Sequence, residues 1–160
     1  MADKLKPHTY KRREVLALAG TGVVVVVAGI GLFPGAASAD AAAVAKAIKK
    51  RIGDKPMKSG RITLELPEIA ENGNTVPIGF EIDSPMTDND YVKAVHIFAE
   101  KNPNPDVATF RFTPGNGKAK VSTRMRLIKS QNIIAVAEMS DGSVYMTKKA
   151  VKVTIGGCGG

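Results

Sequence analysis

Short segments in which apolar and polar residues alternate constrain the fold of this chain more than any other feature of its sequence. Period-two alternation is typical of strands that bury one face. Turn signals such as Asp141-Gly142 and Pro114-Gly115-Asn116-Gly117 separate the segments. The predicted strands are Arg61–Leu66, Val76–Asp83, Tyr91–Ala99, Val107–Phe112, Lys118–Leu127, Asn132–Met139 and Val144–Ile155. Seven such strands within about a hundred residues predict an all-β, immunoglobulin-like antiparallel β-sandwich.

Two details of the pattern refine this prediction. Tyr91–Ala99 is apolar on both faces, as expected of a central strand. In Val144–Ile155 the apolar phase shifts along the strand, which predicts a β-bulge near Lys148-Lys149. Before the strands, Asp40–Arg51 has apolar residues at helical spacing, so we expect one short helix with Asp40 as its N-cap.

The first 39 residues have the organisation of an export signal. Arg12 and Arg13 precede an apolar stretch that is diluted by glycine, and Ala37-Ser38-Ala39 provides a small-x-small cleavage site. The paired arginines indicate the twin-arginine route. A transmembrane anchor is the alternative, but the glycines and the cleavage site favour cleavage after Ala39 and no stable membrane anchor. The predicted organisation is therefore a signal over 1–39, a sandwich domain with its N-terminal helix over 40–155, and an arm over 156–160.

The distribution of charge excludes some partners and favours others. The whole chain has a formal net charge of +8, and residues 107–160 hold nine basic and two acidic groups, net +7. A cationic half attracts anions and acidic partners, although a solvated basic surface without a function is an equal alternative. Nucleic acid is excluded as a partner because the chain is predicted to be exported and does not interleave aromatic with basic residues.

No pattern in the sequence predicts catalysis by this chain alone. His96 shares strand parity with Phe98, so we interpret it as a core or interface histidine. No cluster of residues has metal-ligand spacing, and no cofactor motif is present. Proteins that use the twin-arginine route usually fold before export. Without a cofactor motif, a bound partner protein is the simpler reason for folding first, so we expect a heterodimer.

The last five residues, Gly156-Gly157-Cys158-Gly159-Gly160, contain the only cysteine of the chain. Glycine populates both halves of φ space, so this run is predicted to be a flexible arm. Fully extended, five residues reach roughly 17 Å. A thiol on such an arm can enter a narrow channel, which suits the carriage of a group on the sulfur of Cys158. Flexibility is assigned to Gly156, Gly157, Gly159 and Gly160.

The leader, the strand-rich middle and the terminus Val153–Gly160 together resemble the SoxY family, the sulfur-carrier subunits of the periplasmic thiosulfate-oxidising Sox system. The resemblance implies a periplasmic carrier that is not itself an enzyme and that needs no cofactor. It also implies that Cys158 is the attachment point for pathway intermediates, as a cysteine S-thiosulfonate and a persulfide.

The resemblance implies several partners as well. A SoxZ subunit would form a SoxYZ heterodimer with this chain. The haem cytochrome SoxXA would couple thiosulfate to Cys158, and the hydrolase SoxB would then release sulfate. The sulfane dehydrogenase SoxCD, where present, would oxidise the sulfur that remains.

Two other classes of protein stay open at this point. A ubiquitin-like sulfur carrier ends in Gly-Gly, as Gly159-Gly160 does, but such carriers act in the cytoplasm and the leader contradicts that. An exported structural or interaction β-sandwich could instead use its single cysteine for an intermolecular disulfide.

Overall fold

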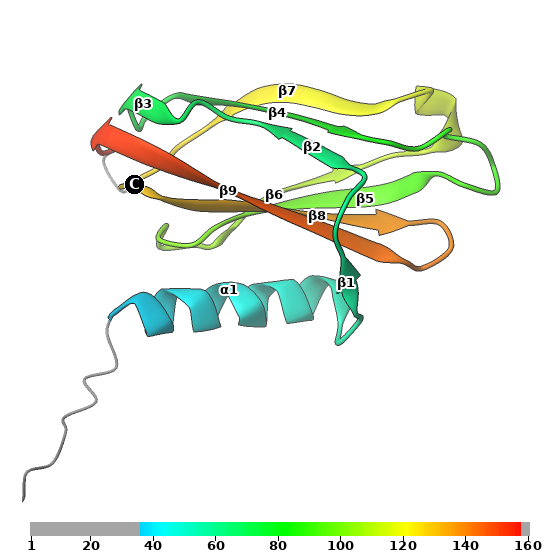
Figure 1. Cartoon of the computed structure of the whole chain (residues 1–160), viewed down its shortest axis with the longest axis horizontal. Helices are drawn as coiled ribbons and strands as arrows, with labels where there is room; N and C mark the ends of the chain where they lie inside the picture. Colours follow the sequence, from blue (N-terminus) through cyan, green and yellow to red (C-terminus); the bar gives the residue numbers. More distant parts are fainter. Residues whose placement is uncertain (1–35, 158–160) are drawn as a thin grey trace, which may run out of the picture. The chain divides into compact units, whose positions relative to one another are not determined.

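The computed structural model describes residues 36–157, and within them the chain forms one helix and a two-sheet sandwich (Figure 1). The predicted signal over 1–39 lies outside the described residues except for its last four positions. The described residues contain no helix that is long and apolar enough to cross a membrane. The elements are α1 (Ala36–Ile52), β1 (Met57–Lys58), β2 (Ile62–Glu65), β3 (Ile69–Asn72), β4 (Val76–Ile82), β5 (Val92–Ala99), β6 (Asp106–Arg111), the 3₁₀ helix η1 (Pro114–Asn116), β7 (Ala119–Met125), β8 (Gln131–Met139) and β9 (Val144–Ile155).

The predicted immunoglobulin-like β-sandwich is confirmed. One sheet has the order β1-β9-β8-β5-β6, with β3 added to β9, and the other has the order β2-β4-β7. All seven predicted strands are present. The sequence analysis missed β1 and β3, and both pair with β9 in parallel, so the sandwich is not wholly antiparallel.

A hydrophobic core fills the space between the two sheets. Its largest fully buried side chains include Phe80, Ile97, Leu127 and Ile133. The alternation of β7 is as predicted, because Met125 is buried while Lys120, Ser122 and Arg124 are exposed. Phe80 also meets Phe110 edge to face, with ring centroids 5.3 Å apart.

A second, smaller core lies on the outer face of the larger sheet, where α1 packs (Figure 1). Val44, Ile48 and Ile52 recur every four residues on one face of the helix and are all buried. Opposite them, the sheet provides Phe98, Ile134, Val136 and Val144. This cover explains why β5 and β8 are apolar on both faces, as the sequence indicated.

The ends of α1 differ in how well the sequence predicted them. The helix begins at Ala36, so Asp40 lies inside it and is not its N-cap; that prediction was wrong. The C-terminal end is as expected, with Lys49, Lys50 and Arg51 in the last turn. Gly53 follows at φ 74° and donates its amide to the Lys49 carbonyl at 2.9 Å, which ends the helix.

Strand β9 contains no bulge, contrary to the prediction from its apolar phase. Its register against β8 is continuous from Val144 to Val151. The phase shifts because the two halves of the strand are buried on opposite faces. Val144 and Met146 face α1, whereas Val151 and Val153 face the core between the sheets.

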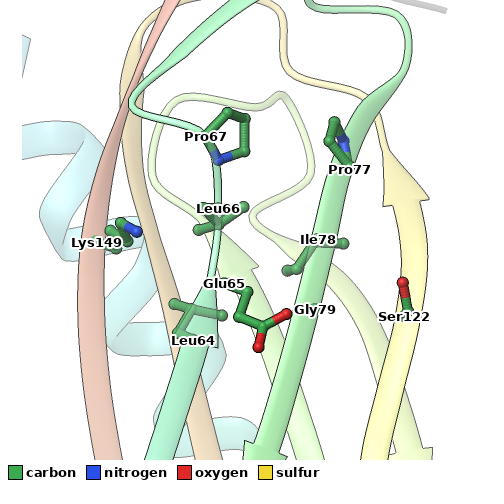
Figure 2. A pocket seen from close by; sticks show the side chains of 9 residues that line it. All are labelled: Leu64, Glu65, Leu66, Pro67, Pro77, Ile78, Gly79, Ser122 and Lys149. Carbon is green, nitrogen blue, oxygen red and sulfur yellow. The ribbon is translucent and has the colours of Figure 1, made fainter.

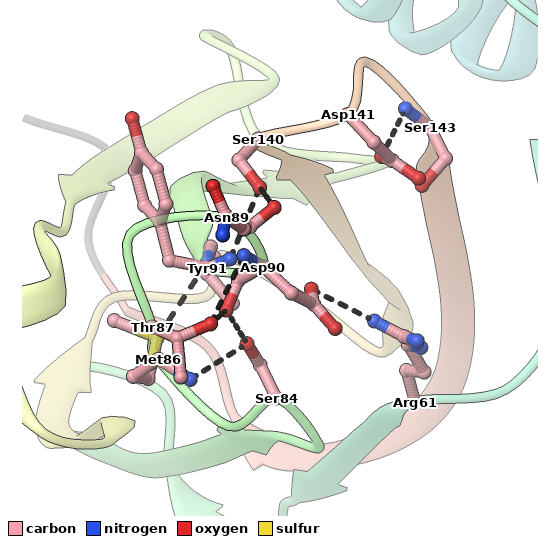
Figure 3. Close-up of polar contacts among 11 residues, drawn as sticks. Arg61, Ser84, Met86, Thr87, Asn89, Asp90, Tyr91, Ser140, Asp141 and Ser143 are labelled. Atoms are coloured by element: carbon pink, nitrogen blue, oxygen red, sulfur yellow. Dashed lines mark hydrogen bonds and ion pairs between the residues drawn. The ribbon is translucent and has the colours of Figure 1, made fainter.

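The end of the sandwich that carries the β8–β9 hairpin is braced by polar contacts (Figure 3). The Tyr91 amide donates to Ser140 Oγ at 3.1 Å, and the Arg61 guanidinium lies 3.5 Å from the Asp90 carboxylate. In the hairpin, the hydroxyl and the amide of Ser143 both donate to Asp141, which lowers the pKa of that carboxyl. Because β9 begins at this hairpin and ends at Ile155, the arm leaves from the opposite end of the sandwich.

Replacing Ile48 by alanine should reduce the free energy of unfolding by about 2–5 kcal/mol, because it leaves a cavity between α1 and the sheet. Lys50→Ala, on the exposed side of the same helix, is the control and should change this free energy by less than about 0.5 kcal/mol. Urea denaturation measures both. Equal stability of the two variants would contradict the docking of α1 on this sheet.

Candidate functional site at the root of the arm

The C-terminal arm leaves the sandwich directly from the end of β9, beside the turn that joins β3 to β4 (Figure 1). Gly156 and Gly157 follow Ile155 and belong to the described residues. Cys158, Gly159 and Gly160 lie outside them, so the predicted flexibility of these glycines and the role of the thiol stay predictions. The structure thus describes the chain up to one residue before the candidate functional group.

Backbone hydrogen bonds hold the chain at this point. The Gly73 amide donates to the Ile155 carbonyl at 2.8 Å, and the Gly73 carbonyl accepts from the Leu127 amide at 2.7 Å. The Leu127 carbonyl then accepts from the Gly157 amide at 2.9 Å. We call this joint the arm root and define it as Gly73, Leu127, Ile155, Gly156 and Gly157.

The glycines of the arm root allow backbones to approach where a side chain would not fit. A Cβ on Gly73 would overlap the Leu127 carbonyl oxygen and would lie 2.5 Å from the Gly157 nitrogen. A Cβ on Gly156 would overlap the Ile128 carbonyl oxygen. A Cβ on Gly157 would lie 2.9 Å from Arg126 Cγ and 2.9 Å from the Gly73 carbonyl oxygen. These positions need glycine for close packing, and none of the three has a positive φ.

The arm root modifies the expectation drawn from the sequence. The glycine run suggested that all of 156–160 is flexible, but Gly157 is buried and hydrogen-bonded in the structure. The sequence pattern did not single out Gly73. Nothing local marks this glycine, because its neighbour Leu127 is 54 positions away in the chain.

One basic and one apolar side chain lie at the arm root, and the acidic Glu71 is close in β3, directly before Asn72, which pairs with Ile155. Arg126 packs against Gly157 through its stem, and the described residues provide its guanidinium with no ion pair. Ile155 is 68% exposed, which is unusual for a large apolar side chain at a strand end. Further along the same half of the chain, Lys120 donates to Glu81 at 2.9 Å, which lowers the pKa of Glu81 and raises that of Lys120. Within residues 36–157, Arg126 thus differs from Lys120, which is paired with a carboxylate.

His96 is a buried structural histidine, as interpreted from its parity. Its Nδ1 lies 2.9 Å from Thr109 Oγ1, and its Nε2 lies 2.9 Å from Glu138 Oε1. Glu138 is also 3.6 Å from the Lys55 ammonium. The pair belongs to the outer face of the larger sheet, beside Phe98. This network contains no residue of the arm root.

A shallow hollow of about 460 Å³ lies between β2, β4 and Lys149 (Figure 2). Its floor is open because Gly79 has no side chain, and the carboxylate of Glu65 lies over that glycine. Glu65 and Lys149 are the only charged residues that line it. The hollow has only one carboxylate, and its lining includes no histidine beside the Ser122 hydroxyl. Within residues 36–157, no group of histidines and carboxylates is arranged to hold a metal ion.

Comparison with known proteins identifies the family. The profile of the family described as sulfur oxidation protein SoxY matches residues 48–158. The solved structure of the sulfur carrier protein SoxY from Chlorobium limicola f thiosulfatophilum aligns with a TM-score of 0.61 and 34% sequence identity, over 72% of this chain and 99% of that chain. Comparison with curated protein sequences gives no match.

More distant structures share the fold. The superoxide reductase (neelaredoxin) from Ignicoccus hospitalis aligns with a TM-score of 0.53 at 16% identity, over 59% of this chain and 80% of that chain. The superoxide reductase from Nanoarchaeum equitans gives 0.51 at 15% identity, over 60% of this chain and all of that chain. Identities this low show a common β-sandwich and nothing about activity.

The fold defines a class of protein, the immunoglobulin-like β-sandwich, and here the last described residue, Gly157, is held against the domain at the arm root. Within that class, the chain belongs to the SoxY family, because the family profile covers 111 of its 160 residues. The resemblance that the terminus suggested is thereby confirmed for most of the described domain.

If His96 is structural, His96→Ala should lower the free energy of unfolding by roughly 1–3 kcal/mol, since Glu138 and Thr109 each lose a buried partner. Lys93→Ala, exposed on the same strand, should change it by less than about 0.5 kcal/mol. Chemical denaturation measures stability, and the rate of Cys158 alkylation by iodoacetamide should be equal in both variants. A variant with normal stability and altered alkylation would instead assign His96 to the functional site.

Proposed function

We propose that this chain is a covalent sulfur carrier that binds thiosulfate-derived sulfur on Cys158 and presents it to sulfur-oxidising enzymes. The family match across the sandwich and up to Cys158 is the observation that carries this proposal. The arm root supports it, because Cys158 follows directly after Gly157, at the end of the domain opposite the β8–β9 hairpin. No residue of this chain is proposed to be catalytic.

The proposed attachment is an oxidative coupling. The Cys158 thiol and thiosulfate form a sulfur–sulfur bond, which gives the S-thiosulfonate R–S–S–SO₃⁻, one proton and two electrons. A haem cytochrome of the SoxXA type accepts those electrons. Cys158 contributes the nucleophilic sulfur, and only its thiolate form is reactive. The positive charge of Arg126, beside Gly157, would favour the approach of the thiosulfate dianion.

The proposed later steps remove and oxidise the attached group. Water cleaves R–S–S–SO₃⁻ in a hydrolase of the SoxB type, which releases sulfate and a proton and leaves the persulfide R–S–SH. Persulfides are reversible states of a cysteine thiol, as a carrier requires. A sulfane dehydrogenase of the SoxCD type would then oxidise the outer sulfur of R–S–SH with three water molecules to R–S–SO₃⁻. This step releases seven protons and passes six electrons to a cytochrome acceptor. The carrier visits each enzyme in turn, so its contacts with each are expected to be transient.

A stable SoxZ-like subunit is the proposed partner in a heterodimer. Strands β6 and β7 end their sheets, and neither pairs with another strand on its outer side within residues 36–157. Between these two edges, a small hollow of about 30 Å³ is lined mainly by apolar side chains, among them Phe110 and Met125. Unpaired edges favour pairing with another chain. This side of the sandwich is therefore our candidate for the subunit interface.

The experiment that tests the carrier function is intact mass spectrometry of the mature protein after incubation with thiosulfate and the cytochrome. We expect an adduct of thiosulfate on the wild-type chain and none on Cys158→Ser. Thermal unfolding of the variant should match wild type, because Cys158 follows the described sandwich. A mass increase equal to a second copy of the chain would instead favour the structural alternative, in which Cys158 forms an intermolecular disulfide.

Replacing Arg12 and Arg13 by lysine tests the proposed export to the periplasm and the partner together. We propose that the partner lacks its own signal and is exported with this chain by the twin-arginine route. Both subunits should then remain in the cytoplasmic fraction, with the precursor uncleaved. The control exchanges Lys4 and Lys6 for arginine and should export normally. Periplasmic recovery of either subunit with the paired lysines would contradict the shared route.

A further inference from the structure

We propose that the arm root fixes the position from which Cys158 is presented, and that Gly73 is a positioning residue for the carrier. This inference rests on the proposed carrier function. A run of glycines suggests flexibility, but here Gly73, Gly156 and Gly157 are assigned the opposite role of holding the chain in place. They immobilise the arm up to Gly157, the residue that precedes Cys158.

The hydrogen bonds of the root support immobilisation. Gly73 contributes both its amide and its carbonyl, to Ile155 and Leu127 respectively, and Leu127 then accepts from Gly157. The bonds are 2.7–2.9 Å long, within the normal range for N–H···O contacts. Three segments far apart in sequence therefore meet at this joint. They are the β3–β4 turn, the chain after β7 and the chain after β9.

Close packing makes the joint specific for glycine. The space that a Cβ would need at Gly73 is occupied by Leu127 and Gly157, and the space at Gly156 is occupied by Ile128. The neighbouring atoms are backbone atoms, which cannot move aside as the end of a flexible side chain can. An alanine at Gly73 or Gly156 should consequently separate the arm from the domain, even though alanine suits both backbone conformations.

The joint restricts how far the cysteine can travel. If the arm moved freely after Ile155, the Cα of Cys158 could lie up to about 10 Å from the Cα of Ile155. With Gly157 held, the Cα of Cys158 stays about 3.8 Å from that of Gly157. A smaller accessible volume raises the effective concentration of the thiol at a docked enzyme. Ordering the root in advance also removes a conformational cost from the binding step.

The test compares Gly73→Ala and Gly156→Ala with Gly115→Ala in the complex of mature chain and partner subunit. Gly115 is the matched control, because a Cβ there would meet only Thr113 Oγ1, at an ordinary 3.6 Å. The first readout is hydrogen exchange at the Gly157 amide. We expect it to accelerate in both root variants and to match wild type in the control.

The second readout is sulfate release by the hydrolase, with the thiosulfonate-loaded complex as the varied substrate. In the root variants, one residue of the arm has to be ordered when the loaded complex binds to the hydrolase. The KM for the loaded complex should therefore rise by roughly 5- to 30-fold. The kcat should stay within about twofold of wild type, because chemistry at the bound thiosulfonate is unchanged. Alkylation of Cys158 by iodoacetamide should also stay within about twofold, since a small reagent needs no positioning.

Two results would overturn the proposal: unchanged exchange at Gly157 in both root variants, or accelerated exchange with unchanged KM. A fall in kcat alone would overturn it as well, since the root would then act on the chemistry. If Gly73→Ala fails to fold, as thermal unfolding would show, Gly156→Ala decides the outcome, since Gly156 follows the last strand. A complex that never loads thiosulfate refutes the carrier function, whereas the exchange readout still tests the joint.

Discussion

Strand β9 buries one face in its first half and the opposite face in its second half, and the rest of the structure depends on this arrangement. The first half buries Val144 and Met146 under α1, and the second half buries Val151 and Val153 between the sheets. One edge of the strand pairs with β8, and the other is shared between β1 and β3. Because α1 and both sheets contact β9, the C-terminal end of this strand has a fixed position relative to the rest of the domain.

That fixed position gives the arm a defined origin at Gly156 and Gly157. The chain after Ile155 does not leave as a frayed end, because Gly73 and Leu127 bond it to two other segments before Cys158 is reached. The proposed carrier function requires contact with several enzymes without strong binding to any of them, so we expect recognition to depend on where the thiol is placed. A short arm held at its root would meet this requirement.

The sequence predicted most of the fold, and its failures have physical reasons. Alternation and apolar runs located seven strands because each buries one face or both, but β1 has two exposed residues and β3 buries only Ala70, so neither has a pattern that can be recognised. The phase shift in β9 was read as a bulge, since the sequence does not show that a helix covers one half of the strand.

The candidate site was predicted only in part, for a similar reason. Cys158 and its flanking glycines stand out in the sequence, but close packing at Gly73 and Gly156 depends on carbonyl groups from distant segments. The most direct test of whether the arm root is anchored is the ¹⁵N backbone order parameter along residues 150–160 of the mature complex. An anchored root should give a value at Gly157 close to that of β9, about 0.85. A value below about 0.6 at Gly157 would contradict an anchored root.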